Sequence, residues 1–210
     1  MPKIFVGVCN SQNTVSADFF WSVIGQQDFV ASPVFARAIH PWDVIRNNQL
    51  ISWFLNTDCE YFVKMDVDQK YPKDYFLRMV PLIEKYKIIG PLIFDRFSAG
   101  NFLPLVNWAD ADQPLDLGSR HGIIEVPYLH TNCFFHRSAL AALKPPYYEA
   151  YMSDDGLKRK NHVDITFMKK FVSAGFKIFV NLDVVVEHLA EVAVSREVHD
   201  TWNRGRKEVL

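Results

Sequence analysis

Short apolar runs alternate with helical segments along most of this chain, and this alternation restricts its fold more than any other feature. Runs rich in β-branched and aromatic residues predict strands at 4–8, 61–65, 88–94, 123–135 and 176–186. An initial Pro or a helical spacing of apolar residues predicts helices at 41–55, 72–83, 138–143 and from about 164 to 175. This order predicts an α/β fold with a mostly parallel central sheet, helices on both faces, and ligands at the carboxyl ends of the strands.

Composition predicts a folded chain and excludes several classes of partner as the main target. The 210 residues are 49% hydrophobic and 22% charged, which is typical of one globular domain and not of a disordered linker. The net charge of −1 provides no overall field that would attract nucleic acid or an anionic membrane, although a local basic patch remains open. No apolar run approaches the roughly 18 residues of a membrane span. We therefore expect a cytoplasmic protein with no membrane span.

The cysteines predict neither a disulfide framework nor a zinc site. Cys9, Cys59 and Cys133 are odd in number, lie far apart and form no Cys-x-x-Cys pair. We expect reduced structural thiols.

The most informative segment is an apolar strand that ends in Asp66-Val67-Asp68. Alternation along a strand places both carboxylates on one side of the chain, at the edge where a parallel sheet binds ligands. Two carboxylates so close together resist joint ionisation unless a cation lies between them, and Mg²⁺ or Mn²⁺ suits oxygen ligands. A solvated acidic turn is the alternative. A second Asp-x-Asp, Asp110-Ala111-Asp112, follows no strand and carries less weight.

Two further segments place ionisable side chains at the ends of elements. His188 follows the apolar run 184–186, and a histidine beside Asp68 would form a mixed imidazole and carboxylate set that favours Mn²⁺; a surface or packed imidazole is the alternative. Asp164 stands at the start of a predicted helix. It is either a helix N-cap that complements the helix dipole or a general base for an acceptor hydroxyl, and the sequence does not choose between them.

In these segments the chain resembles the GT-A glycosyltransferases, and among them the small family-2-like enzymes of bacteria and phages. The resemblance spans nearly the whole chain. It includes the first strand with its polar turn and the Asp-x-Asp with the aromatic-Pro that follows it. The other segments that carry it are 36–47, with its Arg46-Asn47 pair, 88–96, 130–137, Asp164 with the Ala-Gly-Phe turn at 174–176, and His188.

The resemblance implies a Rossmann-like GT-A domain over residues 1–210, with a nucleotide-sugar half of about 1–95 and an acceptor half of about 96–210. Asp68 and His188 would hold Mn²⁺ or Mg²⁺ on the diphosphate of a nucleotide-sugar donor, and UDP is favoured on family grounds. Asp66 would contact the ribose, or the metal through water. The resemblance also implies that Asn10 and Arg46 lie near the nucleotide and that Asp164 is the base if the enzyme inverts.

Several alternatives remain at this stage. A nucleotidyltransferase would need a Gly-rich, basic loop after the first strand, and 9–14 contains no Gly, Arg or Lys. A non-catalytic nucleotide-sugar-binding module is the second alternative, because Val163 stands where the family has Glu. The acceptor is a glycan, a protein or, as in phages, a hydroxylated DNA base.

Other segments have a less certain purpose. The long aperiodic stretch 95–122 is interpreted as an acceptor-side insertion. Pro145-Pro146 is expected to stop the chain's regular structure and leave the next two aromatics exposed. Four aromatic residues either stack on a ligand or cover the edge of the core: Trp108, Tyr147, Tyr148 and Tyr151. Four basic residues near the end of the sequence either form a solvated tail or contact a phosphate-rich acceptor: Arg196, Arg204, Arg206 and Lys207.

Overall fold

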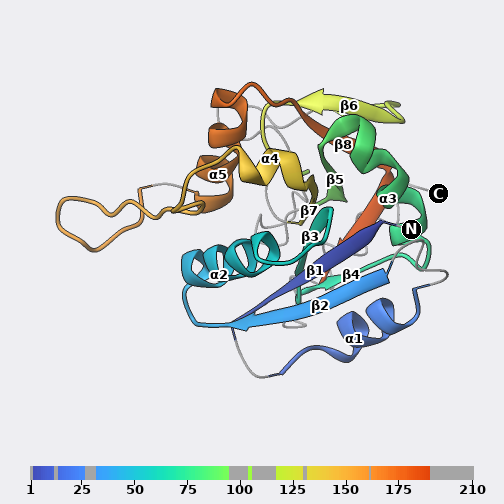
Figure 1. Ribbon diagram of the computed structural model, residues 1–210, viewed down its shortest axis with the longest axis horizontal. Helices are drawn as coiled ribbons and strands as arrows, with labels where there is room; N and C mark the ends of the chain where they lie inside the picture. Colours follow the sequence, from blue (N-terminus) through green and yellow to red (C-terminus); the bar gives the residue numbers. More distant parts are fainter. Residues whose placement is uncertain are drawn as a thin grey trace, which may run out of the picture.

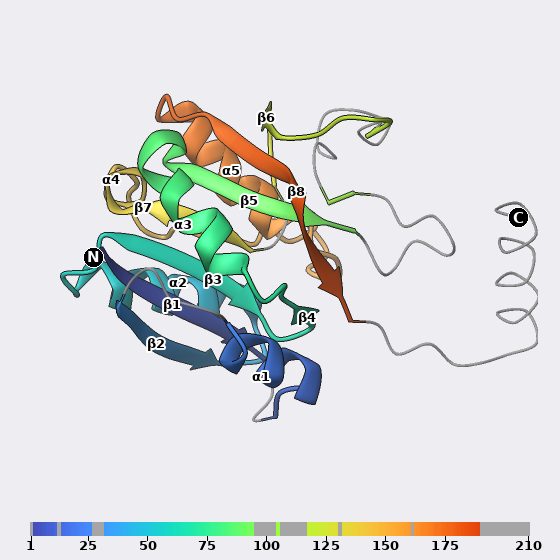
Figure 2. The same cartoon turned by 90° about the vertical axis from the view of Figure 1, so that its right-hand side faces the viewer.

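The protein is an α/β sandwich with a central eight-stranded sheet between two layers of helices (Figures 1 and 2). The computed structural model describes residues 2–11, 14–26, 32–94, 104–105, 117–129, 132–160 and 162–189. Within these ranges no helix is long and apolar enough to cross a membrane.

The strands and helices alternate as the sequence predicts, with boundaries shifted by a few residues. The strands are β1 (Lys3–Asn10), β2 (Ser32–Ile39), β3 (Tyr61–Asp66), β4 (Gln69–Lys70), β5 (Ile88–Ile93), β6 (Ile123–Val126), β7 (Cys133–His136) and β8 (Ile178–His188). The helices are α1 (Ala17–Ile24), α2 (Asp43–Leu55), α3 (Tyr75–Tyr86), α4 (Arg137–Ala141) and α5 (Val163–Ser173). The elements α1, β2 and β4 were not predicted from sequence.

The strand order is β2-β1-β3-β7-β5-β8-β4, and β6 pairs with β8. Strand β1 is parallel to β2 and β3, and β5 is parallel to β8. Because β7 is antiparallel to both β3 and β5, β3 and β5 are parallel to each other. The five strands β1, β2, β3, β5 and β8 therefore all point the same way. Most of the sheet is therefore parallel, and the carboxyl ends of β1, β2, β3, β5 and β8 lie at one edge.

The alternation of side chains along each strand builds two separate cores. In β1, Phe5 and Cys9 face one core, whereas Ile4, Val6 and Val8 face the other. Helices α2, α4 and α5 cover the first face, and α1 and α3 cover the second. The apolar face predicted for the helix after Pro72 is confirmed, because α3 buries Phe76, Met79, Val80 and Ile83.

Helix α5 packs through a different stripe than the sequence suggested. The helical spacing of Ile165, Met168 and Val172 predicts that these three residues form the packing face, but Val172 is 46% exposed. The buried side chains are Val163, Phe167, Met168 and Phe171. The aromatic ring of Phe135 on β7 contacts the rings of Phe167 and Phe171. These aromatic contacts determine which face of α5 packs against the sheet. The predicted helix stop is confirmed, since Gly175 follows the last turn with φ of 86°.

Cys9, Cys59 and Cys133 are buried free thiols, as predicted. Burial raises the pKa of the Cys9 thiol to about 12. A thiol with so high a pKa is not a reactive nucleophile at neutral pH.

Candidate active site at the carboxyl edge of the sheet

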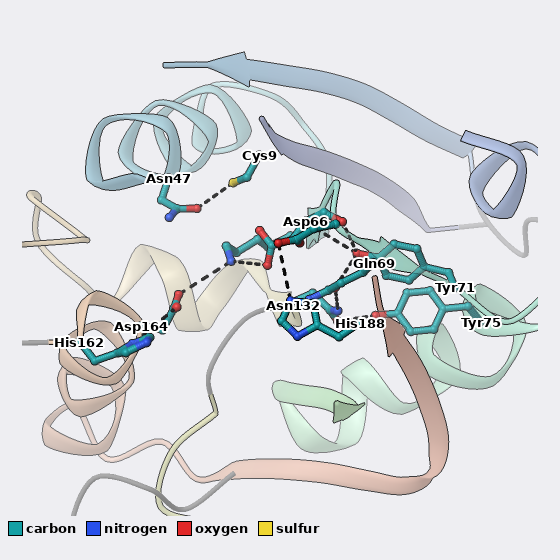
Figure 3. Close-up of polar contacts among 12 residues, drawn as sticks. Cys9, Asn47, Asp66, Gln69, Tyr71, Tyr75, Asn132, His162, Asp164 and His188 are labelled. Carbon is teal, nitrogen blue, oxygen red and sulfur yellow. Dashed lines mark hydrogen bonds and ion pairs between the residues drawn. The ribbon is translucent and has the colours of Figure 1, made fainter. Parts of the chain in front are cut away.

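Polar side chains gather where the parallel strands end. Strand β1 ends at Asn10, β3 at Asp66 and β8 at His188. Asn132 stands directly before β7, whose antiparallel direction brings its first residue to the same edge. The site is therefore assembled from segments that are far apart in the sequence (Figure 3).

The short strand β4 brings Asp68 to His188. After the turn at 67–68 the chain folds back, and Gln69 lies opposite His188 in an antiparallel pair. The backbone N–H of Leu189 donates to the Asp68 carbonyl oxygen at 2.7 Å. As a result, Asp68 Oδ2 lies 3.6 Å from His188 Nε2. The sequence predicted that these two residues meet, and the structure brings them together.

The orientation of the His188 ring is fixed by its other nitrogen. His188 Nδ1 lies 3.0 Å from the carbonyl oxygen of Phe94. Because a carbonyl oxygen only accepts, Nδ1 donates to it, and Nε2 is the ring nitrogen that faces the Asp68 carboxylate. Metal-binding histidines are commonly oriented in this way by a backbone carbonyl.

The Asp68–His188 pair suits a divalent cation that also binds a second molecule. The two side chains are 37% and 13% exposed, so both are accessible from the edge of the sheet. No cluster of three or more His, Cys, Asp or Glu side chains with metal-binding geometry occurs in the described ranges. One or two protein ligands completed by phosphate oxygens are typical of Mg²⁺ sites, and an added imidazole favours Mn²⁺.

Asp66 is held from two sides. Lys64 Nζ donates to Asp66 Oδ2 at 2.9 Å. The backbone N–H of Asp66 donates to the Tyr71 hydroxyl at 3.0 Å. The Asp66 side chain is 20% exposed, which leaves it accessible from the ligand edge.

Lys64 is a functional candidate that the sequence reasoning missed. It lies on the same face of β3 as Asp66, its side chain is only 5% exposed, and Nζ is 3.8 Å from Asp164 Oδ1. Burial alone would lower the pKa of the Lys64 ammonium, but attraction to Asp66 and then Asp164 raises it well above its usual value. The available signal was a lysine inside an apolar strand, two residues before the Asp-x-Asp.

Asp164 lies inside the first turn of α5 and is not its N-cap. The N-cap is His162, and neither it nor Asp164 forms a side-chain capping bond there. The N-cap interpretation of Asp164 was therefore wrong, although a carboxylate in the first turn still complements the helix dipole. Figure 3 shows the Asp164 carboxylate directed toward the Asp66 side of the site.

The Asp164 carboxylate is partly buried and incompletely bonded. Its side chain is 15% exposed. Among the residues that the structure describes, Oδ1 has no hydrogen-bond partner, and His162 Nδ1 lies 3.8 Å from Oδ2. Burial raises the pKa of Asp164, and attraction to Lys64 and His162 opposes that rise. A largely buried carboxylate whose pKa is raised by burial is suited to accept a proton.

Comparisons with known proteins identify the fold. No protein-family model matches this chain, and no curated protein matches it by sequence. Among solved structures, A197 from STIV aligns with a TM-score of 0.59 and 15% identity, over 91% of this chain and 87% of that one. GalNAc-T7 with UDP, GalNAc and Mn²⁺ aligns with a TM-score of 0.57 and 10% identity, over 90% of this chain and 43% of that one.

A UDP-glucose pyrophosphorylase complexed with UDP-glucose aligns over 99% of this chain and 100% of that one, with a TM-score of 0.53 and 8% identity. The chain has a GT-A-type fold. Identities this low establish the architecture alone, which is the α/β class predicted from the sequence.

Asn10 and Arg46 lie near the same edge of the GT-A-type sheet, each held by a local contact. Asn10 is 1% exposed, and its side-chain amide donates to the Thr14 carbonyl oxygen at 3.0 Å. The Arg46 guanidinium donates to the His40 carbonyl oxygen, and its buried Nε has no hydrogen-bond partner within the described ranges. Their predicted contacts with a nucleotide stay predictions.

A buried polar network that sequence reasoning missed supports the Asp-x-Asp turn of the GT-A-type fold. Gln69 Oε1 accepts from the Tyr71 hydroxyl at 2.9 Å and from Asn132 Nδ2 at 2.5 Å, and Asn132 Oδ1 accepts from the Tyr75 hydroxyl at 2.7 Å. All four side chains are at most 3% exposed. The network ties β4, β7 and α3 together beneath Asp66 and Asp68, and so fixes the turn that presents them (Figure 3).

The predicted exposure of the tyrosine pair after Pro145-Pro146 was wrong. Tyr147 and Tyr148 are 8% and 2% exposed, and the Tyr148 ring stacks on Phe167 at 4.1 Å between centroids. Both backbone N–H groups donate to Asn48 Oδ1, which binds this segment to α2. Tyr151 is 51% exposed.

Several predictions lie outside the described residues: Trp108, Asp110, Asp112, His130 and Thr131, the basic residues from Arg196 on, and most of 95–122.

Proposed function

We propose that this chain is a metal-dependent glycosyltransferase that moves a sugar from a nucleotide-diphosphate donor to an acceptor hydroxyl. The observation that carries the proposal is the Asp68–His188 pair, in which a carboxylate oxygen and an imidazole nitrogen face each other at the ligand edge of a GT-A-type sheet. Oxygen and imidazole ligands of this kind suit a divalent cation that is shared with a diphosphate.

Asp68 and His188 fit Mn²⁺, with Mg²⁺ as the alternative metal. The metal supplies Lewis-acid stabilisation of the charge that develops on the departing diphosphate. UDP is the favoured nucleotide, and the solved neighbours support it, since GalNAc-T7 was determined with UDP, GalNAc and Mn²⁺ and the pyrophosphorylase with UDP-glucose.

The remaining residues divide into a donor side and an acceptor side. Asp66, which ends β3, binds the donor ribose, and Asn10 and Arg46 lie along the nucleotide. In an inverting transfer, the acceptor oxygen forms a bond to the anomeric carbon as the bond to the diphosphate oxygen breaks, and the acceptor proton passes to the Asp164 carboxylate. Burial raises the pKa of this carboxyl group, which suits it to take the proton. Residues 1–210 act as one domain in this proposal.

The test is thermal stability of the protein with UDP, GDP, CDP and dTDP, each with and without Mn²⁺. A ligand that binds only the native state raises stability by mass action. We expect a rise with UDP that requires the metal. No rise with any of the four nucleotides would contradict the proposal.

Product analysis then separates the enzyme classes. Release of UDP and free sugar from a UDP-sugar, with water as the acceptor, identifies a catalytic site for sugar transfer, and formation of UDP with a glycosylated acceptor identifies the transferase itself. Metal-dependent nucleotide binding without turnover identifies a non-catalytic module. Formation of UTP from a UDP-sugar and pyrophosphate would instead identify a nucleotidyltransferase, to which the pyrophosphorylase alignment gives some support. Salt-sensitive binding to duplex DNA tests a DNA-base acceptor against a glycan or a protein.

A further inference from the structure

Lys64 is the only charged residue that is buried among the residues the structure describes. It lies in the middle of the sheet, on a strand whose other residues up to Met65 are apolar or aromatic. Removing an ammonium from water is costly unless charged partners compensate, so an apolar side chain would serve the core better at this position. The role of Lys64 must therefore come from what its ammonium contacts.

The Lys64 ammonium lies between two carboxylates from opposite parts of the site. Nζ is 2.9 Å from Asp66 Oδ2 and 3.8 Å from Asp164 Oδ1. Asp66 ends β3 on the donor side, whereas Asp164 belongs to α5 on the acceptor side. Without a cation between them, two carboxylates in one partly buried space resist joint ionisation, and one of them retains a proton.

We infer that Lys64 is a positioning residue that joins Asp66 to Asp164 and keeps Asp164 in the ionised form that a base requires. The inference rests on the proposed function for its meaning in catalysis, but the electrostatic coupling itself is a property of the protein without ligand. Lys64 acts through Asp164 and is not itself placed against the reacting atoms.

Titratable groups from several neighbouring elements affect the ionisation of Asp164. Lys64 and His162 favour its ionised form, and the nearby acidic groups oppose it. The titratable groups that act on it are Lys64 and Asp66 on β3, His162 before α5, Asp43 on α2, Cys9 on β1 and Tyr148. Of these, Lys64 is the strongest influence that favours ionisation, so its removal should dominate the change.

The experiment is a carboxyl ¹³C NMR titration of aspartate-labelled protein, with the Asp164 signal assigned by its loss in Asp164→Asn. We expect the Asp164 midpoint to move to higher pH in Lys64→Met and to stay near the wild-type position in Lys64→Arg, which retains the charge. Lys177→Met is the matched control, because Lys177 pairs with Glu125 on the surface. An unchanged midpoint in Lys64→Met would overturn the inference.

A second comparison covers the case in which Lys64→Met does not fold, since it leaves two carboxylates without their counter-ion. Asp66→Asn and the double variant Lys64→Met/Asp66→Asn differ only in the lysine and leave no unpaired Asp66 carboxylate. We expect a higher Asp164 midpoint in the double variant. Equal midpoints in these two proteins would refute the coupling.

An activity arm separates this inference from the proposed function. If UDP-sugar turnover is found, the acid limb of the kcat/KM profile should move to higher pH in Lys64→Met, with activity falling about tenfold for each pH unit below the new midpoint. A lysine with only a structural role would lower kcat/KM equally at all pH values. If no turnover is found, the proposed function fails while the NMR titration still decides the role of Lys64.

Discussion

Two ionic pairs at the same sheet edge differ in how their charges are balanced. In the Lys64–Asp164 pair, the protein supplies its own cation, and the side chains are 5% and 15% exposed. In the Asp68–His188 pair, a carboxylate oxygen faces the imidazole Nε2, and the side chains are 37% and 13% exposed. The first pair contains its own cation, whereas the second is the pair that we propose binds a cation from outside. Metal dependence should therefore reside in one pair and acid–base chemistry in the other.

The largest expected effect comes from removing the carboxylate of the accessible pair. Asp68→Ala should abolish Mn²⁺-dependent binding of UDP, because His188 alone is a weak site. The stabilisation by ligand, about 2.7 kcal/mol at one hundred times the Kd, should disappear in thermal or chemical denaturation. Asp154→Ala is the control, since Asp154 is 99% exposed and pairs with Lys160 on the surface. Binding that survives Asp68→Ala would remove the metal assignment.

The next effect concerns the buried pair. Asp164→Asn keeps the shape of the side chain but cannot accept the proton, so sugar transfer should fall about 10²- to 10⁴-fold. Binding of UDP with Mn²⁺ should stay at the wild-type level, because Asp68 and His188 are untouched. Kinetics together with calorimetric binding measures both quantities. Unchanged turnover would show that Asp164 is not the base and has only a structural role in the first turn of α5.

A third variant tests how the Asp-x-Asp turn is held without touching either pair. Asn132→Ala deprives the buried Tyr75 hydroxyl and the Gln69 amide oxygen of a partner. Unfolding free energy should fall by about 1–3 kcal/mol, as measured by urea denaturation. Binding of UDP with Mn²⁺ should weaken as well, while the Asp164 titration stays in place. A variant as stable as the wild type would show that the network is not needed.

The smallest effect is expected from an exposed pair beside the site. Lys70 Nζ lies 3.0 Å from Glu187 Oε2 across β4 and β8, and both side chains are largely exposed. Solvent screens such pairs, so Lys70→Met should change the unfolding free energy by about 1 kcal/mol or less. Binding of UDP with Mn²⁺ should persist. A large loss of binding would mean that this ion pair, and not the buried network, holds β4 against β8.

Prediction from sequence was most successful where a residue's environment is set by its own strand or helix. The short apolar runs of β1 and β3 and the helical period of α3 identified which side chains are buried. The same local reasoning placed Asp66, Asp68 and His188 at strand ends, and the parallel arrangement then implied a common edge. It failed for β2, an edge strand whose segment begins with Ser32-Pro33 and contains Arg37, because Pro and a charge within a run weaken a strand prediction.

Prediction was least successful where tertiary contacts decide a side chain's environment. Tyr147 and Tyr148 follow two prolines and resemble an exposed turn, yet Asn48 and Phe167 bury them. Asp164 resembles an N-cap, yet His162 takes that position and the carboxylate points inward.

The sequence by itself determined most of the alternation of strands and helices, the burial of the apolar runs and the strand ends that carry ionisable residues, because these follow from the residue pattern of each short segment. Only the tertiary structure decided that β4 folds back to set Asp68 against His188, and that α5 docks so that Asp164 meets Lys64. The physical reason is that ion pairs and burial depend on how distant elements pack, and the local pattern of a segment does not specify which partner it will meet.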